Sequence, residues 1–181
     1  MMIFICKSTS QEVADVQNDK LKRNVAQFFL ESELNVSHVM KTNVVSIDSE
    51  ASVKDTAAKM VQHGIGSLVV TEQEARPVGI ITETDLLSRI LALGKNPETV
   101  KVKTVMSKPL ICGNPDMDFV EAAKLMINNE IKKLPITKGE RLVGILTITD
   151  VVAVHECMGE LIQEETRGRI PKRFMKRLMK R

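Results

Sequence analysis

The chain of 181 residues has no tryptophan, no tyrosine and only five phenylalanines. Aromatic rings are the platforms on which proteins stack unpaired nucleic acid bases, so a single-strand nucleic acid binder is disfavoured. Long hydrophobic runs are missing too. The run at residues 1–6 is far shorter than the ~18 residues of a membrane span, and no signal-peptide core follows it. We therefore expect a cytoplasmic protein with no transmembrane segment.

Cysteine and histidine are scarce and scattered. The three cysteines, Cys6, Cys112 and Cys157, form no C-x-x-C pair, which argues against a zinc ribbon, and their odd number argues against a disulfide framework. We interpret them as small hydrophobic residues. The three histidines show no metal-ligand spacing, so we expect no metal site and no required cofactor.

Signatures of catalysis are missing as well. The sequence contains no P-loop and no nucleophile elbow, and a catalytic α/β barrel needs about 250 residues, more than the chain has. We therefore expect that the protein is not an enzyme. Its apolar content of 43% is enough to bury the core of one ordinary domain or of two small ones.

The charge is distributed unevenly. Residues 167–181 carry eight lysines and arginines and no acidic residue, whereas residues 1–166 carry 18 basic and 23 acidic residues, a net charge of −5. After Pro171, apolar and basic residues alternate with the period of a helix, so we expect a basic amphipathic helix there. Such a helix binds an acidic protein, nucleic acid phosphates or an anionic surface, or it folds back on its own domain.

What the sequence does contain is an internal repeat. The dipeptide Val-Met at residues 39–40 recurs at residues 105–106, a shift of 66. After the loss of one residue, residues 78–85 (VGIITETD) align with residues 143–150 (VGILTITD) at a shift of 65. Two copies of one structural unit are therefore expected.

Each copy has the pattern of a β-α-β-β-α unit. Sequences that resemble capping boxes, Ser52-x-x-Asp55 and Asp118-x-x-Glu121, begin the first helices. Nearly continuous apolar runs predict strands that are covered on both faces. The expected elements of the two copies are a strand at 44–47 and 110–112, a helix from 52 to about 64 and from 118 to about 130, a strand at 67–71 and 133–137, a strand ending at 82 and 147, and a second helix.

These features resemble a tandem pair of CBS domains, the Bateman module. The resemblance is carried by the doubled unit, the Val-Met dipeptide before each first strand, and the ending G-h-h-T-x-x-D-h-h at residues 79–87 and 144–152. It implies an α+β (α/β-like) fold in which the two repeats pack with pseudo-twofold symmetry and pairs of modules form homodimers. The expected divisions are an N-terminal extension and helix at 1–34, repeats at 35–96 and 97–158, and a basic tail at 159–181.

The Thr-x-x-Asp motifs have a chemistry of their own. A threonine at a helix N-terminus offers a hydroxyl and backbone N–H groups to a phosphate, and an aspartate accepts from two vicinal ribose hydroxyls. In the CBS family these roles fall by position on Thr82 and Asp85, and on Thr147 and Asp150. Thr-x-x-Asp is also close to a capping box, which stabilises the helix without any ligand, and one motif can serve both roles.

The resemblance also implies which side chains flank the base of a bound nucleotide in the clefts between motifs. They are Val44, Val45, Ile65, Leu110, Ile111 and Ile131. In the second copy Lys132 and Lys133 replace Gly66 and Ser67. Cations there favour a polyanionic ligand, so our hypothesis is that the second motif holds the more highly charged nucleotide. The alternative is a solvated strand end, the usual place of lysines.

Together these patterns predict a regulatory module that binds AMP, ADP, ATP or S-adenosylmethionine and signals to a partner protein. The alternative is a ligand-free dimerisation scaffold whose basic tail binds an acidic partner, nucleic acid or an anionic surface. A regulatory switch requires a ligand that binds two conformations with different affinities.

Overall fold

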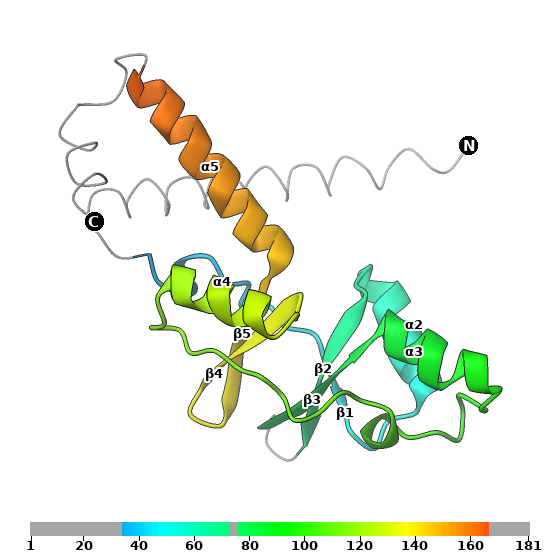
Figure 1. The fold of residues 1–181 in the computed structure, drawn as a ribbon. Coiled ribbons are helices and arrows are strands. Elements are labelled where there is room, and N and C mark those ends of the chain that lie inside the picture. Colours follow the sequence, from blue (N-terminus) through cyan, green and yellow to red (C-terminus); the bar gives the residue numbers. More distant parts are fainter. Residues whose placement is uncertain (1–33, 73–75, 167–181) are drawn as a thin grey trace, which may run out of the picture. The chain divides into compact units, whose positions relative to one another are not determined.

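A computed structural model describes residues 34–72 and 76–166 (Figure 1). The expected N-terminal extension, all but its last residue, and the basic helix after Pro171 lie outside the described residues. Two compact units are present: a first unit of residues 34–40, 116–133 and 146–166, and a second unit of residues 41–115 and 134–145, masked positions excepted. Among the described residues no helix has the length and apolarity to cross a membrane.

The second unit contains a three-stranded sheet of β1 (Ser46–Asp48), β2 (Ser67–Glu72) and β3 (Arg76–Thr82). β1 is parallel to β2, and β2 is antiparallel to β3. The first five residues of β2 are buried, which confirms the prediction of a strand covered on both faces.

Two helices lie side by side next to this sheet, α2 (Val53–His63) and α3 (Glu83–Arg89) (Figure 1). Ser52 caps α2 by accepting from the Asp55 N–H, and Gly64 ends it with a φ of 61°, a left-handed conformation that glycine adopts at little cost. Both the N-cap at Ser52 and the helix end near residue 64 are therefore confirmed. The buried core of this unit consists of Val53, Met60, Leu68, Val70, Ile81, Ile90, Val102, Val105 and Met106.

The second repeat supplies α4 (Phe119–Asn128), β4 (Lys133–Lys138), β5 (Arg141–Thr147) and α5 (Ile148–Thr166). Asp118 caps α4 as predicted, and β4 and β5 form a two-stranded sheet. Short 3-10 helices at η1 (Val36–His38) and η3 (Val102–Thr104) repeat at the shift of 66, and a third, η2 (Leu91–Leu93), follows α3. The mixed helix and strand content confirms the expected fold class.

The predicted strand at residues 110–112 is wrong. Its place is taken by a single parallel bridge between Gly113 and Ile136, the counterpart of one of the three pairs that join β1 to β2. Pro135 stands where β2 has Val69, and proline has no N–H to donate to a neighbouring strand. The second copy therefore lacks a regular counterpart of β1.

Gly79 gives the first testable prediction. A Cβ atom on Gly79 would lie 2.6 Å from Met106 Sδ and 3.0 Å from the Ser107 carbonyl oxygen, because β3 and the segment after Val105 are in direct contact. Gly79→Ala should lower the free energy of unfolding by ~1–3 kcal/mol through overpacking. Urea denaturation measures this change.

The matched control is Gly159→Ala in α5, where a Cβ atom would meet nothing within 4 Å. Alanine is the better helix former, so this variant should be neutral or more stable by up to ~1 kcal/mol. Equal effects of the two substitutions would contradict the close contact at Gly79.

Candidate functional site

The Thr-x-x-Asp motif at the end of β3 forms a closed capping box. Thr82 donates from its backbone N–H to Asp85 Oδ2 at 2.8 Å and from Oγ1 to the same oxygen at 2.7 Å. The Asp85 N–H donates back to Thr82 Oγ1 at 3.2 Å. The second motif repeats this geometry, with distances of 2.8 and 2.6 Å from Thr147 N and Oγ1 to Asp150 Oδ2. Both Thr-x-x-Asp motifs thus form the hydrogen bonds of a capping box.

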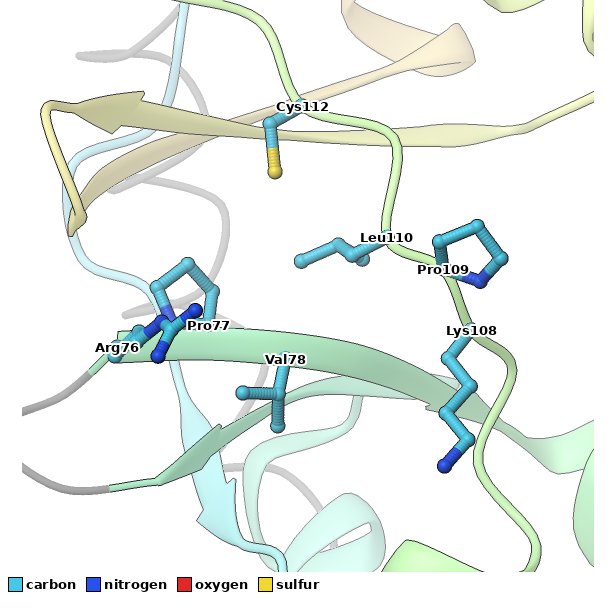
Figure 2. A pocket seen from close by; sticks show the side chains of 7 residues that line it. All are labelled: Arg76, Pro77, Val78, Lys108, Pro109, Leu110 and Cys112. Atoms are coloured by element: carbon cyan, nitrogen blue, oxygen red, sulfur yellow. The ribbon is translucent and has the colours of Figure 1, made fainter.

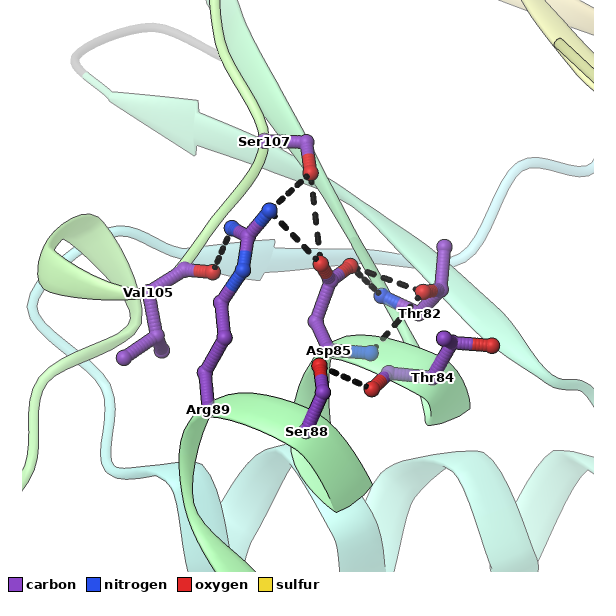
Figure 3. A network of polar contacts seen from close by, with 7 residues as sticks. All are labelled: Thr82, Thr84, Asp85, Ser88, Arg89, Val105 and Ser107. Carbon is purple, nitrogen blue, oxygen red and sulfur yellow. Dashed lines mark hydrogen bonds and ion pairs between the residues drawn. The ribbon is translucent and has the colours of Figure 1, made fainter. Parts of the chain in front are cut away.

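The surroundings of Asp85 contain two residues that the sequence interpretation missed (Figure 3). Asp85 is only 7% exposed, and its second carboxylate oxygen, Oδ1, lies 3.2 Å from Arg89 Nη2 and accepts from Ser107 Oγ at 3.3 Å. The i, i+4 spacing of Asp85 and Arg89 on a helix was the available signal for the ion pair. Nothing in the sequence pointed to Ser107.

The two motifs differ in the residues around them. The second copy has Ile148 in place of Glu83 and Lys132 in place of Gly66. In the first motif the Glu83 side chain lies over Gly66, with Oε2 at 2.8 Å from where a glycine Cβ would be, and the Glu83 N–H donates to the Gly66 carbonyl. The first motif therefore carries an acidic group where the second has a lysine.

The second motif is adjacent to the predicted lysine pair. The Ile148 N–H donates to the Lys132 carbonyl at 2.9 Å, so the backbone before β4 meets the start of α5 next to Thr147. Lys132 is exposed and Lys133 is half-buried. The structure thus brings the Lys132 backbone next to the residue that follows Thr147.

An open pocket of about 600 Å³ lies along β3 in the second unit (Figure 2). The segment after Met106 runs antiparallel to β3, because Ile80 and Ser107 exchange backbone hydrogen bonds of 3.1 and 2.8 Å. The same segment therefore reaches Asp85 at Ser107 and the pocket a few residues later. The lining residues are Arg76, Pro77, Val78, Lys108, Pro109, Leu110 and Cys112.

The pocket is apolar with two cations at its edge. Arg76 and Lys108 are exposed, whereas Val78, Leu110 and Cys112 are half-buried. Burial raises the pKa of the Cys112 thiol, so the neutral thiol is favoured and Cys112 behaves as the small hydrophobic residue that the sequence suggested. Among the described residues no group of three or more His, Cys, Asp or Glu side chains could hold a metal ion.

The six side chains that the sequence predicted to flank the base are all half-buried. Leu110 lines the pocket, whereas Val45 and Ile65 pack against the core of the second unit. In the first unit, Ile131 follows α4 and donates its N–H to the Met126 carbonyl. Val44 and Ile111 are not among the residues that line the pocket. The structure thus brings Leu110 into one pocket with Val78, Lys108 and Arg76, three residues that the sequence interpretation had not named.

Comparison with known proteins places these observations in a family. The CBS domain family model matches residues 36–92 and 102–156. CBS domain-containing protein YhcV of Bacillus subtilis is 34% identical over 126 residues, which cover 70% of this chain and 88% of that protein.

Solved structures of CBS proteins have the same fold. The hexameric CBS-CP12 protein from bloom-forming cyanobacteria is 32% identical with a TM-score of 0.60, over 66% of this chain and 67% of that one. The CBS domain pair of protein MJ0100, solved in complex with 5′-methylthioadenosine and S-adenosyl-L-methionine, is 23% identical with a TM-score of 0.61, over 68% of this chain and 97% of that one. The doubled capping motif, the repeated elements and these matches lead to one conclusion: the chain belongs to the CBS domain family and contains two CBS domains in tandem.

Proposed function

We propose that this CBS pair is a regulatory module that binds an adenosine-containing ligand, AMP, ADP, ATP or S-adenosylmethionine, at its Thr-x-x-Asp motifs and signals to a partner protein. The observation that carries the proposal is the apolar pocket of about 600 Å³ on β3, the strand that ends in Thr82. This open depression is mostly apolar with a few polar groups, the kind of lining on which the base of a nucleotide packs. The ligands of the MJ0100 pair support the choice of adenosine compounds.

In the first motif, the base packs between Val78 and Leu110, and the Asp85 carboxylate is the acceptor for the ribose hydroxyls. Arg76 Nε lies 3.9 Å from Glu140 Oε1, so Lys108 supplies most of the positive potential that favours an anionic ligand at the mouth of the pocket. The Glu83 carboxylate repels a phosphate group that lies close to Thr82. The first motif therefore favours adenosine compounds that carry little negative charge near Thr82.

In the second motif the charges are reversed. Thr147 precedes α5, a helix of 19 residues whose N-terminus attracts anions, and Lys132 and Lys133 lie next to it. We therefore assign the more phosphorylated nucleotide to Thr147 and Asp150.

Exposed apolar side chains recur at equivalent helix positions in both repeats. Val61 of α2 is 82% exposed and its counterpart Ile127 of α4 is 65% exposed, and Leu87 of α3 and Val152 of α5 are exposed as well. Apolar groups that both copies present to solvent favour a homodimer that covers them. They also favour the second candidate function, a ligand-free dimerisation scaffold whose working part is the basic tail, of which residues 167–181 lie outside the described residues.

Replacing the carboxylates tests the ligand sites. Asp85→Asn and Asp150→Asn keep a side-chain oxygen for the cap but remove the charged acceptor for the ribose, so each should weaken binding at its own motif by about tenfold or more. Isothermal titration with AMP, ATP and S-adenosylmethionine measures the affinities.

Asp55→Asn is the matched control, because Asp55 also exchanges hydrogen bonds with the side chain of its N-cap residue, Ser52, at the start of α2. It should leave all affinities unchanged. The proposal fails if no adenosine compound binds to the folded, ligand-free protein, or if all three variants bind equally well.

Removal of the lysine pair tests the assignment of phosphate. Lys132→Ala/Lys133→Ala should weaken ATP binding by about tenfold and AMP binding by less, because fewer phosphate oxygens lose a charged partner. The exposed pair Lys124→Ala/Lys138→Ala serves as a control for net charge. Unchanged ATP affinity in the first variant would show that Lys132 and Lys133 are a solvated strand end.

Cys112 reports on the pocket directly. Because burial raises its thiol pKa, alkylation should be slow at neutral pH and should accelerate as the pH rises toward that pKa. A ligand in the pocket should slow the alkylation further at every pH. Mass spectrometry of a Cys6→Ser variant follows the reaction, with buried Cys157 as the internal reference. Saturating ligand that leaves the Cys112 rate unchanged would place the ligand elsewhere.

A further inference from the structure

All acceptor positions of the Asp85 carboxylate are occupied from within the protein. Oδ2 accepts two hydrogen bonds from Thr82, and Oδ1 accepts one from Ser107 Oγ and pairs with Arg89 Nη2. An ionised carboxylate offers about four lone-pair sites, so none is left for a ribose diol. A nucleoside can reach Asp85 Oδ1 only if Arg89 and Ser107 withdraw.

Arg89 also ties two parts of the second unit together (Figure 3). Its Nη1 donates to the Val105 carbonyl at 2.6 Å and its Nη2 donates to Ser107 Oγ at 3.2 Å. One guanidinium thus links α3 to the segment that leads into the pocket at Lys108 and Leu110. Withdrawal of Arg89 from Asp85 also changes its contacts with this segment.

The second repeat has no such arginine. The counterpart of Arg89 is Val154, which is completely buried, and the counterpart of Ser107 is Lys41. An arginine one helical turn after the capping aspartate is therefore a feature of the first repeat and not of the second. It cannot be a requirement of the capping box, because Thr147 and Asp150 form the same cap without an arginine at that position.

We infer that Arg89 is an internal competitor for the ribose-accepting carboxylate of the first motif: it lowers the affinity of Asp85 for a nucleoside and, when displaced, loosens residues 105–107. The inference rests on the proposed function and adds a residue that sets the affinity of one motif. Ligand binding at Asp85 is thereby coupled to the backbone that forms one wall of the pocket.

The test is titration of AMP in an Asp150→Asn background, in which the second motif is weakened. Arg89→Met keeps the length of the side chain and removes the guanidinium, so AMP should bind about tenfold more tightly, the reverse of the usual effect of removing a cation near an anionic ligand. Arg89→Lys keeps the charge but loses the forked donors, so it should bind AMP with intermediate affinity. Arg141→Met, at an exposed position of β5, is the control.

Amide hydrogen exchange tests the coupling. In the parent protein, AMP should speed the exchange of the amide hydrogens of residues 105–107. In Arg89→Met, the same amides should exchange faster than in the parent protein even without AMP. Equal or weaker AMP binding by Arg89→Met overturns the inference, as does ligand binding with unchanged exchange at these residues. If Arg89→Met does not fold, Arg89→Lys decides by the same criteria. Absence of AMP binding to the protein with both aspartates intact would contradict the proposed function itself.

Discussion

A carboxylate shielded from water needs hydrogen-bond donors on both of its oxygens, and Asp85 meets this need at the junction of three segments. It closes the N-terminus of α3 through Thr82, accepts from Ser107 on the segment that runs along β3, and pairs with Arg89 one helical turn away. The position of the pocket depends on this junction, because the chain that passes Asp85 at Ser107 provides Lys108, Leu110 and Cys112 a few residues later. The group that stabilises this junction is thus also the one to which our proposal assigns the ribose.

Both repeats contain this capping motif, but different residues surround it in each. Both copies keep the threonine and aspartate that cap the helix, but Glu83 and Arg89 in the first are replaced by Ile148 and Val154 in the second. The first motif is therefore acidic near its threonine and has its carboxylate engaged by a guanidinium. The second has two lysines beside its threonine. Two motifs with the same helix cap but different neighbouring charges would bind two related ligands with different affinities.

The sequence predicted what depends on local spacing. The N-caps at Ser52, Asp118, Thr82 and Thr147 and the end of α2 at Gly64 all follow from residue types that act within one helical turn, and the structure confirms them. The prediction of a strand at residues 110–112 is wrong because a strand there must pair with β4. In β4, Pro135 has no N–H to donate to it. The pocket and the contact of Arg89 with Val105 could not be predicted, because they join residues brought together only by the pairing of Ile80 with Ser107.

The central claim is that an adenosine compound binds at the Thr-x-x-Asp motifs, and a crystal structure of the protein grown with saturating AMP tests it most directly. The account predicts ribose hydroxyls within hydrogen-bond distance of the Asp150 or Asp85 carboxylate, and, where the first motif is filled, a purine ring between Val78 and Leu110 with Arg89 withdrawn from Asp85. A ligand bound away from both aspartates, or both motifs unchanged and unoccupied at saturating AMP, would contradict it and leave the two motifs as helix caps in a dimerisation scaffold.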